Sequence, residues 1–474
     1  MKKFYLFLFI LFVAFGCGGN KEKYHYDYIL ETDEDIIRPV SGTPEKWVYI
    51  IGGNLTGTYY VSPDGNNSND GTREHPWGTP AFGASQISPG DTLVILPDSN
   101  RTRPILAGSD NLLTAIDLSG KSYVWIENLE ITHNDNLSKE GKYFRDGIEI
   151  LGEPSHHITL KNLYIHHIDE FGMNFQDVDT LNIIDCRIEY CGFGGLGGPA
   201  PEAGGWRNVV IRGCTLSYSG HYYQGTDGSS RPYDRPDGFG IEASSGPILI
   251  EKTIASHNYG DGLDSKAENT TISQCIVSNN SCDGVKLWGD NSKVINTLIY
   301  GRGDRNPEQT PWSPLLIHCE YKQNAKFEII NVTIDDTAGN NYLFYAQYDS
   351  GLPPIEITMK NTILCGRGGN SPVFVRGNCT FNALNNLFYL PRNEIILIYG
   401  DSTYTSSNID KFGTGNIYGN PLFLKTAWGI EGDYHLSNGS PGIDRGTSDG
   451  SPVIDLDGNT RPIGAGIDIG CYER

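Results

Sequence analysis

The sequence has 474 residues, enough for a large core, and its 58 glycines, 27 tyrosines and 3 methionines favour a loop-rich, all-β fold. The formal net charge of −21 argues against a general nucleic-acid binder, because phosphate contacts need clustered Lys and Arg. An acidic substrate is still compatible with this charge, since a local basic strip can oppose the global sign. The ten cysteines show no zinc-type spacing and predict no disulfide framework.

Residues 1–16 predict a signal peptide. Two lysines precede an apolar run that is shorter than the roughly 20 residues of a membrane span. The small residues before Cys17 resemble the lipobox of bacterial lipoproteins, although Phe15 departs from the strictest pattern. This resemblance implies that Cys17 is lipidated and that residues 17–56 tether an exported outer-membrane lipoprotein. The alternative is an ordinary signal peptide followed by an incidental cysteine.

Residues 57–98 predict an N-terminal cap, with a short helix over 81–86 and a first strand over 91–96. From about residue 120 one pattern recurs: a short β-branched strand, an Asn or Cys, and a second short strand, as in TLKNLYIH. Such a repeat predicts a right-handed parallel β-helix over 57–425, in which each repeat is one coil and insertions form loops. Residues 426–474 then close the stack, since repeat stacks need capped ends.

We expect the Asn or Cys of each repeat to form one column of bends. Asn tolerates left-handed backbone geometry, and stacked Asn amides bond each other along the helix axis. The small cysteines in this pattern are interpreted as members of the same column rather than as catalysts. The predicted column contains Asn128, Asn162, Cys186, Cys214, Lys252, Cys275, Asn296, Asn331, Asn361 and Asn386.

A second recurrence is an Asp-Gly pair that returns at one-coil spacing. The steps from Asp237 to Asp261 and from Asp261 to Asp283 predict that these three aspartates share a column. Three residues further on, Gly240, Asp264 and Lys286 form a neighbouring column by the same alignment. Stacked carboxylates repel one another, and Ca²⁺ prefers oxygen ligands.

We therefore predict a Ca²⁺ site at Asp237, Asp261 and Asp264, with Lys286 beside it. Asp146 and Asp283, which also stand in Asp-Gly pairs, are interpreted as turn residues.

The runs YGDGLDSK and CDGVKLWG, one coil apart, resemble family nine of the polysaccharide lyases, the pectate and rhamnogalacturonan lyases. The resemblance implies that Asp237, Asp261 and Asp264 bind Ca²⁺ and that Lys286 is the catalytic base of a β-elimination. In that reaction a uronate carboxylate binds the ion, the base removes the C5 proton, and the 4-linked sugar leaves. The two ends of the chain resemble those of many bacterial β-helix carbohydrate-active proteins.

The sequence departs from this family at Gly260, where the family has a further aspartate. Water, a backbone carbonyl or Glu242 could replace that ligand. Lys266, Arg302 and Arg305 are candidate substrate-binding residues, and the arginines suit bidentate contacts with carboxylates. A surface role is the alternative for all three cations. The aromatic residues that stack on sugars or simply pack are Trp288, Trp312, Tyr342, Tyr345 and Tyr348.

Three other functions fit the same pattern. A glycoside hydrolase could use Asp261 and Asp264 as its carboxylate pair, but it would give Lys286 no role. A uronate epimerase shares the proton abstraction. A non-catalytic glycan-binding surface protein would use the Asp column structurally. We expect a monomer that binds an acidic polysaccharide, contacts the membrane only through its lipid, and binds no nucleic acid.

Overall fold

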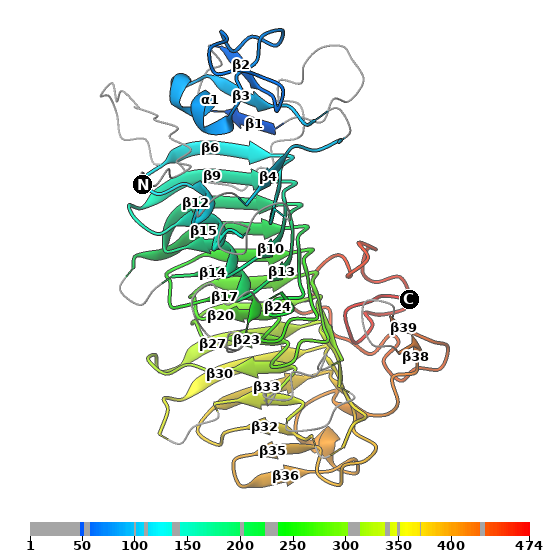
Figure 1. Cartoon of the computed structure of the whole chain (residues 1–474). Coiled ribbons are helices and arrows are strands. Elements are labelled where there is room, and N and C mark those ends of the chain that lie inside the picture. Colours follow the sequence, from blue (N-terminus) through cyan, green and yellow to red (C-terminus); the bar gives the residue numbers. More distant parts are fainter. Residues whose placement is uncertain are drawn as a thin grey trace, which may run out of the picture.

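The computed structural model places three parallel sheets side by side around one core (Figure 1). Each coil of the chain visits sheet A, then sheet B, then sheet C, and the next coil stacks on it in register. The residues that the structure describes are 48–51, 57–98, 101–108, 112–134, 143–199, 203–222, 236–301, 313–336, 342–347, 351–369, 371–426 and 432–474.

Sheet A has the longest strands and shows the alternation expected from the sequence. In β12 (Asp177–Ile184) Leu181 and Ile183 point into the core, and Val209 and Ile211 of β15 stack on them in register. The other strands of sheet A are β2 (Thr58–Val61), β3 (Thr92–Ile95), β1 (Val48–Ile51), β6 (Ser122–Glu127), β9 (Ser155–Lys161), β15 (Gly205–Arg212), β18 (Ile248–Glu251), β21 (Thr270–Ser273), β24 (Ser292–Ile295), β27 (Ala325–Ile330), β30 (Ile355–Lys360) and β33 (Thr380–Leu384).

Sheet B follows sheet A after a bend of one left-handed residue. Its strands are short, because the bends on either side lie only a few residues apart. They are β4 (Ile105–Ala107), β7 (Glu130–Thr132), β10 (Tyr164–Ile168), β13 (Arg187–Cys191), β16 (Thr215–Ser217), β19 (Ile254–Ser256), β22 (Ile276–Ser278), β25 (Leu298–Tyr300), β28 (Thr333–Asp336), β31 (Ile363–Gly366), β34 (Leu387–Tyr389) and β37 (Ile417–Tyr418).

Sheet C completes each coil, and β14, β17, β20 and β23 lie one below another in the middle of the stack (Figure 1). Its strands are β5 (Thr114–Asp117), β8 (Asp146–Ile150), β11 (Phe171–Phe175), β14 (Gly194–Gly198), β17 (Asp237–Ile241), β20 (Leu263–Ser265), β23 (Val285–Leu287), β26 (Leu315–Ile317), β29 (Phe344–Ala346), β32 (Val373–Val375), β35 (Leu397–Tyr399) and β36 (Ser402–Tyr404).

The bend between sheets A and B corrects one expectation from the sequence. Asn128, Asn162 and Lys252 are left-handed, as expected, but in the cysteine-containing coils the left-handed residue is the one before the cysteine. The side chain at the bend points outward and the next side chain points into the core, where a small thiol fits. The bend residues and the cysteines therefore occupy two adjacent columns, not one, and Asn386 lies in the column of the cysteines. In four coils the bend lies one residue before its predicted position. The bend residues are Asp185, Gly213, Gln274 and Asn385, where Cys186, Cys214, Cys275 and Asn386 were predicted.

The N-terminal cap contains the predicted helix, α1 (Pro80–Gln86), which begins where the Thr79 hydroxyl accepts a hydrogen bond from the Phe82 N–H. Strand β1 lies between β3 and β6 and pairs antiparallel with both. Val48–Ile51, at the end of the segment 17–56 that the sequence analysis placed before the cap, belong to sheet A. No helix among the described residues is long and apolar enough to cross a membrane.

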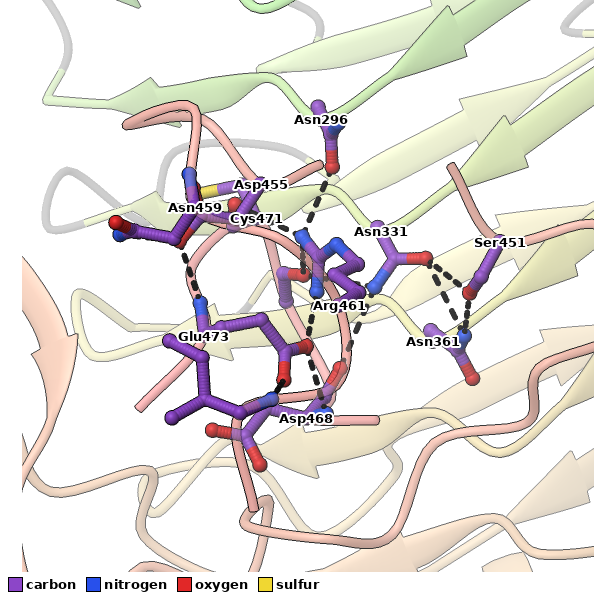
Figure 2. A network of polar contacts seen from close by, with 12 residues as sticks. Asn296, Asn331, Asn361, Ser451, Asp455, Asn459, Arg461, Asp468, Cys471 and Glu473 are labelled. Carbon is purple, nitrogen blue, oxygen red and sulfur yellow. Dashed lines mark hydrogen bonds and ion pairs between the residues drawn. The ribbon is translucent and has the colours of Figure 1, made fainter. Parts of the chain in front are cut away.

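The closing segment returns along the side of the stack instead of covering its end (Figure 1). It begins slightly before residue 426, because β38 (Phe423–Lys425) pairs with β39 (Asp433–Leu436), after the short 3-10 helix η1 (Ile409–Lys411) and β37. The outward side chains of the A–B bend hold it: Asn331 Nδ2 donates to the Gly470 carbonyl at 3.0 Å and Asn296 Nδ2 to the Ile454 carbonyl at 2.6 Å. Figure 2 shows this contact around Arg461 and Glu473.

Nine cysteines lie in the described part of the chain, and all are buried free thiols. Burial raises the pKa of Cys275 and of Cys471 to about 12, so neither forms a thiolate at neutral pH. We expect none of the nine to react with an aromatic disulfide reagent before the protein unfolds, and all nine to react in denaturant. Mass-spectrometric mapping of labelled sites is the measurement. Rapid labelling of any of the nine in native protein would contradict this packing.

Candidate active site

Sheet C aligns the residues that the sequence placed in columns. Its strand pairing sets Gly240 of β17 beside Asp264 of β20, and Asp264 beside Lys286 of β23. One coil occupies each step, so the three side-chain positions lie about 4.8 Å apart along the helix axis. The alternation of the strands turns these positions outward, away from the core.

The second column, at the start of the same strands, is tied together through its carboxylates. Asp237 Oδ1 accepts a hydrogen bond from the Asp261 N–H at 2.6 Å, and Asp261 Oδ1 accepts one from the Asp283 N–H at 2.7 Å. Asp283 repeats the contact with the N–H of Ser313 at 2.7 Å. One oxygen of each aspartate thus fixes the next coil. Asp283, interpreted from the sequence as a turn residue, makes the same contact between coils as the other two aspartates.

Asp237, Asp261 and Asp264 meet at one point. Each offers an oxygen that lies within 4.8 Å of the oxygens of the other two. Asp261 and Asp264 are 3% and 5% exposed. Burial and the neighbouring carboxylates raise the pKa of Asp237, and burial is the main cause of the raised pKa of Asp264. Three crowded carboxylates of this kind need a positive charge beside them.

Lys286 supplies one positive charge. Its Nζ lies 2.7 Å from Asp264 Oδ2 and 3.1 Å from Asp261 Oδ2, and the residue is 7% exposed. Burial alone would lower the pKa of Lys286, but Asp261, Asp264 and Asp237 together reverse this effect and raise it. The ammonium form is therefore strongly favoured while the carboxylates face it.

Lys266 and Trp288 flank this centre at the end of sheet C. Lys266 forms an ion pair with Glu242 on the preceding coil. The Nζ atoms of Lys266 and Lys286 both lie 5.3 Å from the centre of the Trp288 ring, within cation–π range. The Trp288 Nε1 atom is buried and has no hydrogen-bond partner among the described residues. Because Glu242 pairs with Lys266, it does not add a fourth carboxylate to the cluster of Asp237, Asp261 and Asp264.

A cavity of about 290 Å³ opens beside Asp237 and Asp264, toward the N-terminal end of the stack. Glycines form its floor, because a Cβ atom at Gly197 would lie 2.2 Å from Phe171 Cε1. The sequence analysis had singled out Asp237, Asp264 and Lys266 at one edge of this cavity but not its N-terminal wall, since loops of unequal length separate these coils and hide the alignment. The aromatic and amide residues lining it are Phe171, Phe193, Asn174 and Gln176.

Gly240 lies against the Asp237 carboxylate, so a larger side chain at this position should move that carboxylate. A Cβ atom at Gly240 would lie 2.6 Å from Asp237 Oδ2. If the three aspartates bind Ca²⁺ as the sequence predicts, Gly240→Ala should displace the Asp237 carboxylate and weaken that binding about tenfold or more, with thermal stability measured in parallel. Calorimetric titration with Ca²⁺ measures the effect, and Gly152→Ala, at an exposed position where a Cβ atom would meet Ser119 only at ordinary contact distance, is the control. Equal Ca²⁺ affinity in the Gly240 variant and the native protein would exclude Asp237 as a ligand.

Several candidates lie outside the described residues: Cys17, Arg302, Arg305, Trp312 and Tyr348. Tyr342 and Tyr345 stack on each other with ring centres 4.3 Å apart, on the C-terminal side of Lys286. Asp146, interpreted as a turn residue, is buried, and its Oδ1 accepts a hydrogen bond from the Phe171 N–H on the next coil at 3.1 Å.

Comparison with solved structures finds β-helical proteins of low sequence identity. A pectate lyase is 15% identical with a TM-score of 0.46, and the match covers 89% of this chain and 97% of that chain. A rhamnogalacturonan lyase is 14% identical with a TM-score of 0.41, covering 83% and 97%. The A-module of a mannuronan C-5 epimerase from Azotobacter vinelandii is 15% identical with a TM-score of 0.46, covering 75% and 91%.

No curated protein matches the sequence. A family model described as a right-handed β-helix region matches residues 99–231, which include the first coils of the stack. This match agrees with the coil order of the three sheets. The chain folds as a right-handed parallel β-helix.

Proposed function

We propose that the protein is a polysaccharide lyase that cleaves a uronic-acid-containing polymer by Ca²⁺-assisted β-elimination. One observation carries the proposal: the buried amine of Lys286 lies within 3.1 Å of two members of a three-aspartate cluster on the outer face of sheet C. A lysine at this place has no role in a hydrolase, which works with two carboxylates. A proton-abstracting enzyme uses both the cluster and the amine.

The donor set suits Ca²⁺. Carboxylate oxygens are the preferred ligands of this hard cation, and Asp237, Asp261 and Asp264 bring three of them together. Asp264 Oδ1 is buried without a hydrogen-bond partner among the described residues, so it can serve as a ligand without losing a contact. When bound, the ion would neutralise the substrate carboxylate and make the adjacent C5–H more acidic.

In the proposed reaction the aspartates and Lys286 have separate roles. The three aspartates hold the cation, and Lys286 accepts the C5 proton once it has lost its own proton. Carboxylates that face a cation hold the lysine proton less firmly, so ion binding favours the neutral amine. Trp288 closes one side of Lys286, and Lys266, which pairs with Glu242 at the edge of the cavity, is proposed to bind the substrate carboxylate. The C4–O bond breaks as the C4–C5 double bond forms, the oxygen of the released sugar takes up a proton from water, and an unsaturated uronate remains.

We propose further that the enzyme is exported and held at the outer membrane by lipid on Cys17, which lies outside the described residues. In this arrangement residues 18–47 separate the lipid from β1 and let the β-helix reach polymers near the envelope. The catalytic unit is proposed to be a monomer, since one coil stack carries the whole candidate site.

One experiment tests the activity. Purified protein is incubated with uronate polymers, with Ca²⁺ or with chelator, and ultraviolet absorbance of the unsaturated product is followed. A lyase gives absorbance only with Ca²⁺. New reducing ends without absorbance mean a hydrolase, and altered uronate stereochemistry without cleavage means an epimerase. Binding with none of these changes means a glycan-binding protein, and each of the last three outcomes overturns the proposal.

A further inference from the structure

A column of side chains follows directly after the strands of sheet C and borders the candidate site. Its members are the first residues after β17, β20, β23 and β26, namely Glu242, Lys266, Trp288 and His318. The Trp288 N–H donates to the Ser265 carbonyl at 2.9 Å, and the His318 N–H donates to the Leu287 carbonyl at 2.9 Å. The same backbone contact recurs from coil to coil and stacks these side chains along the helix axis.

Trp288 is the member of this column that contacts cations from two coils. The Nζ atoms of Lys266 and Lys286 both lie 5.3 Å from the centre of its ring. An ammonium group is attracted to the face of an indole ring, and the attraction is stronger where little water reaches the pair. Lys286 is buried and Trp288 is half-buried, so water competes little with this contact.

The neighbouring coils fix the Trp288 ring. On its C-terminal side the His318 ring packs against it with ring centres 4.5 Å apart, and His318 is fully buried. The His318 Nε2 atom in turn lies 3.1 Å from Glu320 Oε1. Gly289, which follows Trp288, lies directly on the preceding coil, because a Cβ atom there would be 1.9 Å from the Ala267 carbonyl oxygen. The indole therefore has little freedom to turn away from the two lysines.

The ion pairs by themselves do not hold the two amines in one place. Lys266 pairs with Glu242, whose side chain is half-exposed, and such pairs are weak. Lys286 contacts both Asp261 and Asp264, and in the proposed reaction it turns from these carboxylates toward the C5 proton. An aromatic face attracts the ammonium and packs against the apolar stem of a lysine, and neither contact needs one fixed rotamer.

The indole N–H takes no part in this contact. Trp288 Nε1 is buried and has no hydrogen-bond partner among the described residues. A buried donor without a partner lowers stability, so hydrogen bonding does not explain an indole at this position. The aromatic face beside the two amines does.

We infer that Trp288 is a positioning residue, which holds the amines of Lys286 and Lys266 against one aromatic ring and so sets their separation. This inference rests on the proposed function, in which Lys286 is the base and Lys266 binds the substrate carboxylate. The ring then fixes where the base stands relative to the bound sugar. Trp288 contributes to kcat, while Glu242 still holds Lys266 near its place and substrate affinity changes little.

Trp288→Leu and Trp288→Phe test the inference, with kcat and KM measured separately at saturating Ca²⁺. Leucine removes the aromatic face, and we expect kcat to fall about tenfold or more while KM changes less than about threefold. Phenylalanine keeps an aromatic face and loses no hydrogen bond, so kcat should stay within about threefold of the native value. A raised KM with native kcat in Trp288→Leu would mean that the indole stacks on the sugar, and would overturn the inference.

Nuclear magnetic resonance of protein with ¹³C-labelled lysine ε-carbons reports the position of the amines without turnover. Protons near an aromatic face resonate at high field, so the ε-methylene signals of Lys286 and Lys266 should be shifted in the native protein and in Trp288→Phe. They should return to ordinary lysine values in Trp288→Leu. Ordinary values in the native protein would overturn the inference. If the native protein yields no unsaturated product, the proposed function fails, and these signals still decide whether Trp288 holds the amines.

Trp125→Leu is the matched control. Trp125 is half-buried on the outer face of sheet A, where its Nε1 donates to Glu127 Oε2 at 2.9 Å. Its replacement should leave kcat, KM and the lysine signals at their native values. A loss of kcat in Trp125→Leu as large as that in Trp288→Leu would reflect a general sensitivity to the loss of a tryptophan and would contradict the inference.

Discussion

Lys286→Met is expected to lower kcat/KM for the uronate polymer by about 10²- to 10⁴-fold, the usual contribution of a general base. Methionine keeps much of the volume of the side chain and removes the amine that lies 2.7 Å from Asp264. Ca²⁺ binding should be retained or strengthened, since the ammonium no longer competes for the carboxylates. Absorbance kinetics at saturating Ca²⁺, together with calorimetry, measure both effects.

The thermal stability of the Lys286→Met variant provides a second test. Without the ammonium, Asp261 and Asp264 are left as buried carboxylates with no cation, a defect that costs about 3–5 kcal/mol. We therefore expect the Tm of Lys286→Met to fall in chelator and to recover in Ca²⁺ more than that of the native protein. Lys293→Met is the matched control, because Lys293 lies on sheet A at the start of the next coil and pairs with the half-exposed Glu328. Full turnover in Lys286→Met, or equal loss in Lys293→Met, would contradict the assignment of the base.

Arg461→Met is expected to destabilise the protein by about 3–5 kcal/mol, because it leaves the carboxylate of Glu473 buried without its partner. Both side chains are 0% exposed, and Arg461 Nη1 lies 2.5 Å from Glu473 Oε1. Arg461 also donates to Asn296 Oδ1 at 2.9 Å and to the Cys471 carbonyl at 3.0 Å, and so joins the closing segment to the coils (Figure 2). Urea unfolding measures the change in the free energy of unfolding.

Two further variants separate the ion pair from a general sensitivity of this segment. Arg445→Met changes an exposed arginine nearby and should shift the free energy of unfolding by no more than about 0.5 kcal/mol. The double variant Arg461→Met/Glu473→Met should cost less than the sum of the two single changes, because it leaves no unpaired charge. An Arg461→Met variant as stable as the native protein would mean that the closing segment is held by its apolar contacts alone.

Much of this molecule follows from local patterns. Alternating apolar residues such as Leu181 and Ile183 recur once per coil, and stacking of equal positions then fixes the three sheets. The one-coil steps between Asp237, Asp261 and Asp283 predict from the sequence that Asp264 lies beside Lys286, and the strand pairing confirms it. The prediction succeeded because no long insertion interrupts these coils, so the number of residues between successive aspartates corresponds to one turn of the β-helix.

The tertiary structure alone decided the remainder, for identifiable reasons. A left-handed backbone conformation is not restricted to one residue type. The amino-acid sequence therefore could not show that the bend lies at Gln274 and that the Cys275 side chain packs in the core. Insertions of unequal length hid the alignment of Phe171 and Asn174 with the site. The return of the closing segment onto Asn296 and Asn331 depends on contacts more than a hundred residues apart, which no local pattern encodes.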